Sequence, residues 1–190
     1  MATTDFVQTA AIVVSVLALF YQLRREWLLH SAEMVTGLVT EYNSEDFENR
    51  RKNLAALLAP VAKGERISIA DASVFGVLGF YENLGHLVRR GALDELMVWN
   101  KFSWDLVCYF ECLVLGDNAL RKLREQFGDP TLYEEMEWLN ARFLRIYRRR
   151  GVSLFGKDGR VRWLSDFLSQ ERRLGSHASG SQELGVPTFK

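Results

Sequence analysis

The sequence has few of the residue types that bend or cross-link a protein chain, and it has no net charge. Its 190 residues include three prolines and two cysteines, and 24 acidic side chains balance 24 basic ones. So few cysteines exclude a disulfide framework and agree with a reducing compartment. A neutral balance argues against general nucleic-acid binding, which requires an excess of positive charge to neutralise phosphates. Alternating patterns typical of β-strands are nearly absent, which favours an all-α fold.

Motifs with a known chemical mechanism are also absent. The chain has no Gly-rich phosphate loop, no G-x-S-x-G nucleophile elbow, no H-E-x-x-H zinc motif and no EF-hand loop. We therefore assign no catalytic, cofactor-binding or metal-ligating residue and expect no cofactor. This absence favours a non-enzymatic interaction or scaffold module over an enzyme.

Charge is missing altogether from the eighteen residues Phe6–Leu23, FVQTAAIVVSVLALFYQL. A helix of that length spans roughly 27 Å, close to the hydrocarbon thickness of a bilayer. Asp5 precedes the run, whereas Arg24 and Arg25 follow it, and basic residues stay on the cytoplasmic side. The pattern predicts a single-pass membrane protein with its N-terminus outside and a cytoplasmic C-terminal domain.

Two other interpretations of this run remain open. A cleaved signal peptide would need a basic n-region and a small-residue cleavage site, and the sequence has neither. A buried helix of a globular domain can also be apolar on all sides. If the run does cross a bilayer, the small residues Ala11 and Ser15 would allow spans to associate, as in a membrane effector of bacterial defence.

Helical periodicity and capping residues divide the chain into three parts. Residues 1–29 form the N-terminal segment with the transmembrane helix, residues 30–173 a cytoplasmic helical bundle of about five to six helices, and residues 174–190 a disordered tail. We expect the first helix to continue without a linker to about Tyr42. The further helices are expected at 45–58, 68–90, 93–115 with a kink near Asn100, 118–127, 130–149 and 162–173.

Local signals set several of these boundaries. Ser44 can cap the second helix, and Ser68 with Asp71 resembles a capping box for the third. Asp129 followed by Pro130 predicts an N-cap with proline at the first helical position.

Four polar residues of the third and fourth predicted helices are the best candidates for a chemical site. Glu82 and His86 lie one helical turn apart and could form an acid–base pair, although the same spacing is typical of an ordinary ion-pair ladder. If Asp105 and Tyr109 converge with them on a cleft, the protein could be a small-ligand sensor or an uncharacterised enzyme.

Two further groups have both a structural and a functional interpretation. Cys108 and Cys112 could join His86 in a metal site, but their apolar surroundings favour core packing. Basic residues at the end of the predicted 130–149 helix suit the negative end of the helix dipole, and they could also contact anionic lipid. These basic residues are Arg142, Arg145, Arg148, Arg149 and Arg150.

Two segments carry a resemblance to a known family. YENLGHLVRRGALD occupies residues 81–94 and GDPTLYEEMEWL occupies residues 128–139. Together with the N-terminal apolar run, they resemble a bacterial family of uncharacterised membrane proteins, domain of unknown function 4760, over most of residues 6–150. The resemblance implies a small bacterial membrane protein with a helical cytoplasmic domain, which places the predicted span in the bacterial inner (plasma) membrane. From the predicted span and the lack of catalytic motifs, we expect the partners to be the lipid bilayer and another protein or a second copy of the chain. It carries over no catalytic residue.

Overall fold

The computed structural model describes residues 2–60, 72–115, 119–154 and 159–174. Within these residues the chain forms seven helices and no strand. The predicted all-α fold is therefore confirmed.

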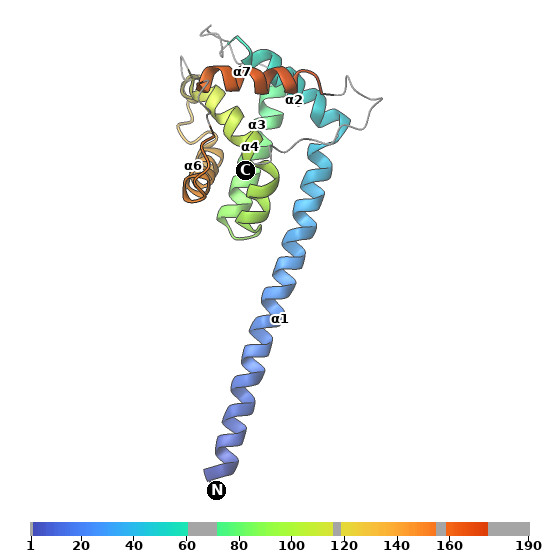
Figure 1. Ribbon diagram of the computed structural model, residues 1–190, viewed down its shortest axis with the longest axis vertical. Coiled ribbons are helices and arrows are strands. Elements are labelled where there is room, and N and C mark those ends of the chain that lie inside the picture. Colours follow the sequence, from blue (N-terminus) through green and yellow to red (C-terminus); the bar gives the residue numbers. More distant parts are fainter. Residues whose placement is uncertain (1, 61–71, 116–118, 155–158, 175–190) are drawn as a thin grey trace.

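The first helix, α1 (Ala2–Tyr42), is much longer than the others and points away from them (Figure 1). Its C-terminal part lies beside the remaining helices, which we call the helical body, whereas its N-terminal part projects beyond it. The predicted continuation to Tyr42 without a linker is confirmed. The chain then turns, and the Ser44 side chain accepts a hydrogen bond from the Phe47 backbone N–H at 3.3 Å, which caps α2 (Glu45–Leu58).

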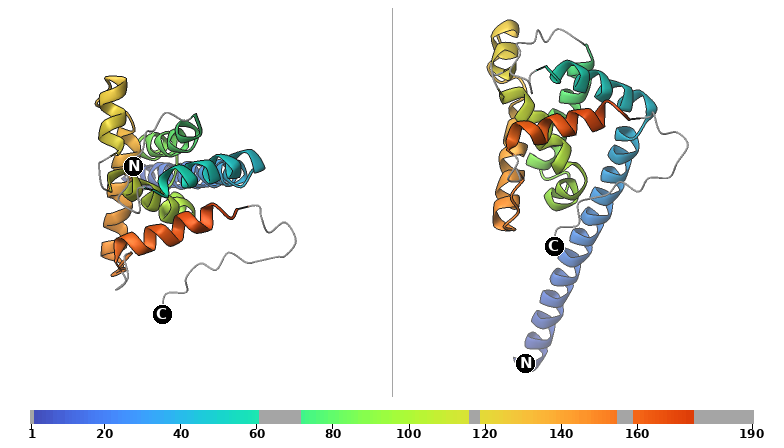
Figure 2. Two further views of the ribbon diagram at one scale, coloured as in Figure 1. Left: turned by 90° about the horizontal axis from the view of Figure 1, so that it is seen from above. Right: turned by 45° about the horizontal axis from the view of Figure 1, so that its top comes forward.

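The helical body contains α2 and five more helices in two crossing directions (Figure 2). They are α3 (Ala72–Arg89), α4 (Glu95–Val114), α5 (Ala119–Phe127), α6 (Glu134–Arg149) and α7 (Arg160–Glu171). Helix α3 packs on α2 and α6, α4 packs on α6, and α7 lies across α2 and α4. The largest completely buried side chains are Tyr81, Tyr109, Phe102 and Phe143, with leucines of α2, α3 and α4 around them.

Helix α6 begins four residues later than the sequence predicts. Pro130 is not its first residue, because Asp129 caps a turn instead: its carboxylate accepts hydrogen bonds from the Thr131 backbone N–H at 2.8 Å and hydroxyl at 2.6 Å. Tyr133 then has a φ of 60°, which ends this turn, and the helix starts at Glu134. The side chain of Tyr133 is nevertheless buried, so the turn is anchored in the core.

Other predicted boundaries lie closer to the observed ones. Helix α4 runs unbroken through Asn100, and the Asp94 carboxylate caps it by accepting from the backbone N–H groups of Leu96 and Met97, both at 2.9 Å. The proposed capping box at Ser68 and Asp71 lies outside the described residues, as does the predicted tail from residue 175 onward.

The predicted membrane span is wrong. A span needs about 20 predominantly apolar residues. None of the helices formed by the described residues is long and apolar enough to cross a bilayer. The run after Phe6 was recognised by its lack of charge, but the polar residues Gln8, Ser15 and Gln22 interrupt it at every second turn. The prediction of a single-pass inner-membrane protein with an external N-terminus and a cytoplasmic domain is corrected accordingly.

Candidate functional site

Two charged side chains lie on faces of α2 and α7 that are otherwise apolar. On α2 the buried residues are Phe47, Arg51, Leu54, Ala55 and Leu58, and on α7 they are Leu164, Phe167, Leu168 and Glu171. The helical spacing thus turns Arg51 and Glu171 into the core together with their apolar neighbours. There the guanidinium donates two hydrogen bonds to the Glu171 carboxylate, from Nε at 2.8 Å and from Nη2 at 2.6 Å. This bidentate geometry is the strongest that an arginine and a carboxylate can form.

Three tyrosines extend this ion pair into a buried polar network. The Tyr109 hydroxyl donates to Glu171 Oε2 at 2.5 Å. The Tyr42 hydroxyl donates to Asp105 Oδ2 at 2.6 Å, and because its only proton is used there, Tyr81 donates to Tyr42 across 3.0 Å. The side chains come from α1, α2, α3, α4 and α7, so the network joins five of the seven helices of the described chain.

The two halves of the network meet at a stacked contact. The Arg51 guanidinium carbon lies 4.1 Å from the centre of the Tyr42 ring, close enough for a cation–π interaction. The same positive charge therefore faces Glu171 on one side and the Tyr42–Asp105 hydrogen bond on the other.

Burial decides the protonation states of the network. It raises the pKa of Asp105 from 3.8 to about 6, and the nearby Arg51 charge opposes this rise. Burial also raises the pKa values of Tyr42, Tyr81 and Tyr109 well above 10. The tyrosines are thus neutral hydrogen-bond donors, which is the state that a structural network requires and the opposite of an activated nucleophile.

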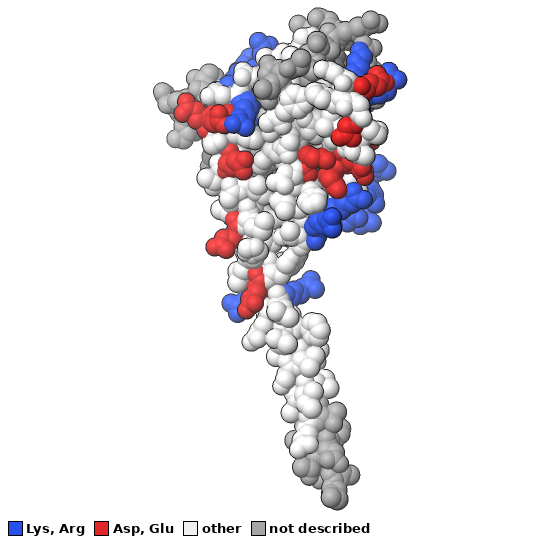
Figure 3. Space-filling model, turned by 180° about the vertical axis from the view of Figure 1, so that it is seen from behind, with Lys and Arg blue, Asp and Glu red and all other residues white. Residues whose placement is uncertain are grey.

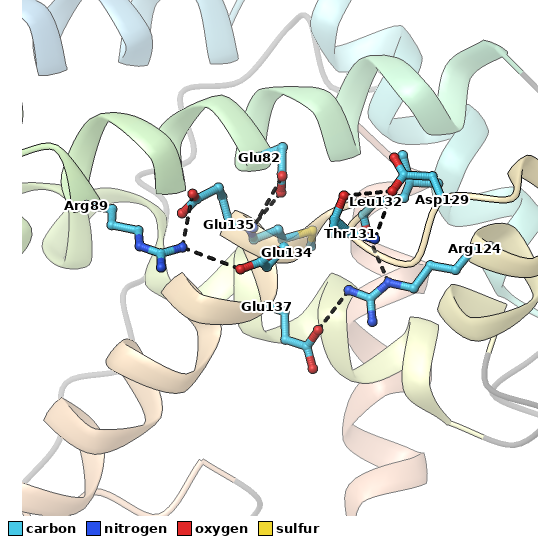
Figure 4. A network of polar contacts seen from close by, with 10 residues as sticks. Glu82, Arg89, Arg124, Asp129, Thr131, Leu132, Glu134, Glu135 and Glu137 are labelled. Atoms are coloured by element: carbon cyan, nitrogen blue, oxygen red, sulfur yellow. Dashed lines mark hydrogen bonds and ion pairs between the residues drawn. The ribbon is translucent and has the colours of Figure 1, made fainter.

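Of the four candidate residues, Asp105 and Tyr109 belong to this network, whereas Glu82 and His86 do not. His86 is exposed on α3. Glu82 points at the start of α6, where its carboxylate accepts the backbone N–H groups of Glu135 at 3.2 Å and Met136 at 2.8 Å (Figure 4). It thereby replaces the missing local N-cap of α6 and complements the positive end of its dipole.

Further ion pairs surround this junction. Arg89 Nη1 lies 3.1 Å from Glu135 Oε1 (Figure 4). Arg124 donates from Nε to the Leu132 carbonyl oxygen at 2.9 Å and from Nη2 to Glu137 Oε2 at 2.8 Å. The acidic first turn of α6 is therefore used for helix packing.

The five arginines in the C-terminal half of α6 and just after its end differ in whether their guanidinium groups contact other helices. Arg142 makes a bidentate pair with Glu95, and Arg150 stacks on the Trp99 ring with its guanidinium carbon 4.2 Å from the ring centre. Arg145, Arg148 and Arg149 are exposed, and basic side chains gather on this flank of the body in the view from behind (Figure 3). Contact of this patch with anionic lipid stays a prediction.

The two cysteines are packed in the core. Cys108 and Cys112 are both buried as free thiols, and burial raises the pKa of Cys112 to about 12. Across the residues that the structure describes, no group of three or more metal-ligating side chains could hold a metal ion.

Sequence reasoning found Asp105 and Tyr109 but missed their partners Tyr42, Arg51 and Glu171. A usable signal did exist: Arg51 and Glu171 each occupy a position of the apolar stripe of their helix, at i+4 or i+7 from buried hydrophobic residues. A charged residue at such a position needs a buried partner of opposite sign.

The described residues form an all-helical body with one long projecting helix, so this is a protein of the all-α class. A buried network of arginine, acidic and tyrosine side chains connects five of its helices. The family described as Domain of unknown function (DUF4760) matches residues 6–143, and the chain belongs to it. Comparisons with curated proteins and with solved structures give no match.

Proposed function

We propose that this protein is a non-enzymatic interaction module, and that the projecting part of α1 is the surface through which it binds another protein. The observation that carries this proposal is the exposure of large apolar side chains along that part. Ile12, Phe20 and Tyr21 are 65%, 66% and 71% exposed. Their exposed apolar neighbours are Val13, Val14, Val16, Leu17, Leu19 and Leu23.

The size of this apolar surface supports binding. Isolated exposed hydrophobic residues are common on proteins, but a contiguous patch of this extent marks an interaction site. Burying one such side chain is worth about 1.5–3 kcal/mol, so six of them would contribute on the order of 10 kcal/mol. This is comparable to the free energy that association costs in lost motional freedom.

The polar network supports a structural role over a catalytic one. Its carboxylates and hydroxyls are directed at each other, and its tyrosines keep their protons. Glu82 and His86, which an acid–base site would have needed, lie elsewhere on α3. The network therefore supports a structural role: it connects five helices of the body, from which the projecting part of α1 extends toward a partner.

Chemical crosslinking in cells tests the proposal. The wild-type chain should appear in crosslinked complexes larger than one chain. The double variant Leu17→Glu/Phe20→Glu places two charges on the apolar surface and should reduce these complexes at least tenfold.

A matched control adds the same charge to the polar side of the helix. Gln8→Glu/Gln22→Glu should crosslink like the wild type, because both glutamines are exposed polar residues already. If the wild type crosslinks only as a single chain, or if both double variants lose the complexes equally, the proposal is wrong.

A further inference from the structure

The apolar surface of α1 continues a face that the body already covers. Ser31 and Val35 are buried where α1 lies against the body, and Leu38 packs there as well. Eighteen residues make five full turns of an α-helix. Val13, Leu17 and Phe20 precede these three residues by eighteen positions each, so they lie on the same side of α1.

A narrow line of polar residues runs along the opposite side of the projecting part. Gln8, Ser15 and Gln22 repeat every seven residues, about two turns, and form one line along the helix. All three are exposed, and the Ser15 hydroxyl donates to the Ala11 carbonyl at 2.8 Å within the helix. The projecting part thus has one line of polar residues suited to water, and its apolar side opposite this line extends past the end of the body without cover.

We infer that α1 of a second copy covers this apolar side, with the two helices antiparallel and related by a twofold axis level with Ser15. This inference rests on the proposed function and names the partner. A twofold arrangement presents the same surface from both copies, so a self-complementary helix meets its requirement. In this register Val13 of each copy lies level with Leu17 of the other.

The distribution of charge favours the antiparallel orientation. Asp5 is the only charged residue before Arg24, and Arg24 and Arg25 follow the uncharged run directly. Antiparallel pairing about Ser15 places Arg24 and Arg25 of the two copies at opposite ends of the helix pair, separated by the length of the uncharged run. A parallel pair would instead place the arginines of both copies side by side, and like charges at such spacing are destabilising.

The position of the body also fits this register. Trp27 Nε1 donates to the Gly91 carbonyl at 2.9 Å, which marks the level at which α1 reaches the body. The overlap of residues 6–24 ends before this level and extends for roughly 30 Å, and the first residues of each helix, 2–4, reach the level of Trp27 of the other copy. The two bodies then lie at opposite ends of the helix pair. Because one neighbour covers only one side of each helix, two such pairs can also associate as a four-helix bundle.

Site-directed crosslinking of the purified full-length protein tests the pairing. Chains carrying Val13→Cys and chains carrying Leu17→Cys are mixed and treated with a short bismaleimide. We expect the mixed 13–17 product to exceed the 13–13 and 17–17 products several-fold. The native Cys108 and Cys112 are buried, so the wild-type chain reports their background. Gln22→Cys, on the polar side, should crosslink weakly with itself and with either variant.

Sedimentation of the same purified protein separates the inference from the proposed function. A dimer, or a dimer of dimers, supports the inference. Excess of the 13–13 and 17–17 products means parallel helices and overturns it. A purified monomer that still forms complexes in cells overturns the second copy as partner but leaves the proposed function standing. A monomer in both experiments overturns both.

Discussion

Glu171 is the residue on which most of the buried network depends. Its carboxylate accepts hydrogen bonds from Arg51 and Tyr109, and its side chain is only 7% exposed. It stands at the last turn of α7 and contacts residues 120 and 62 positions earlier in the chain. Because water cannot replace these partners at a buried site, removing one charge leaves the other without compensation.

We predict that Glu171→Gln destabilises the protein by about 3–5 kcal/mol, since it removes the carboxylate that pairs with the buried Arg51 and leaves Asp105, which makes no hydrogen bond to Arg51 in the structure, as the nearby negative charge. Denaturant unfolding followed by circular dichroism measures this. Asp166→Asn removes an exposed carboxylate from the same helix and should change the stability by less than about 0.5 kcal/mol. The double variant Arg51→Met/Glu171→Leu should recover most of the loss, because both charges leave the core together. If Glu171→Gln is as harmless as Asp166→Asn, the pair does not support the fold.

Asp105 should make the stability depend on pH. Its pKa is about 6 in the folded chain and 3.8 when unperturbed, so between these values the folded chain binds more protons than the unfolded chain. The Asp105 contribution to stability is therefore fully present below about pH 4 and is lost as the pH rises through about 6. Asp105→Asn has no such loss. Its stability relative to wild type should rise between pH 4 and pH 8, by at most about 3 kcal/mol. Parallel pH profiles of the two proteins would contradict the assignment.

The contact between α3 and α6 shows how one element depends on another. Gly85 of α3 lies so close to α6 that an added Cβ would be 2.4 Å from the Glu135 carbonyl oxygen. One turn earlier, Glu82 caps the same end of α6. Close approach and capping therefore act together to place the start of α6.

Gly85→Ala should destabilise the protein by about 1–3 kcal/mol, because the backbone of α6 must move away to admit the methyl group. Gly79→Ala is the matched control on the same helix, since a Cβ there meets no described atom within 4 Å. Alanine is a better helix former than glycine, so this control should stabilise the protein by up to about 1 kcal/mol. Thermal unfolding of both variants measures the difference. Equal effects of the same sign would rule out the close contact.

The elements differ in how far the sequence predicts them. The second helix was predicted with its observed boundaries because Ser44, which caps it, is adjacent in sequence. The start of α6 was missed because its cap is Glu82, more than fifty residues earlier, and no local pattern reports such a contact. The same limit applies to the site: Asp105 and Tyr109 were singled out, but Tyr42 and Glu171 come from the two ends of the fold. Local capping signals are readable from sequence, whereas long-range pairings must be inferred from charged residues on apolar faces.

Helix α1 lies in two different environments. From Trp27 onward its side chains contact the body, where the buried Ser31 hydroxyl oxygen accepts the Asp94 backbone N–H at 2.7 Å and Tyr42 joins the polar network. Residues 12–23 lie beyond the body (Figure 1). The body should therefore fold without the projecting part, although it needs the C-terminal part of α1.

We predict that deletion of residues 2–23 leaves the free energy of unfolding of the body within about 0.5 kcal/mol of that of the non-associating Leu17→Glu/Phe20→Glu variant, because the large apolar side chains between Ile12 and Leu23 are exposed. The same deletion should abolish self-association, which sedimentation measures.

Extending the deletion to residue 35 removes two residues that contact the body. Ser31 accepts a hydrogen bond from the backbone N–H of Asp94, the residue that caps α4, and Val35 is buried in the core. The longer deletion should cost at least about 3 kcal/mol, the sum of a lost hydrogen-bond acceptor and a core cavity. If the shorter deletion already unfolds the body, the projecting part is a component of the fold. Its exposed apolar residues would then have to be explained by folding and not by a binding partner.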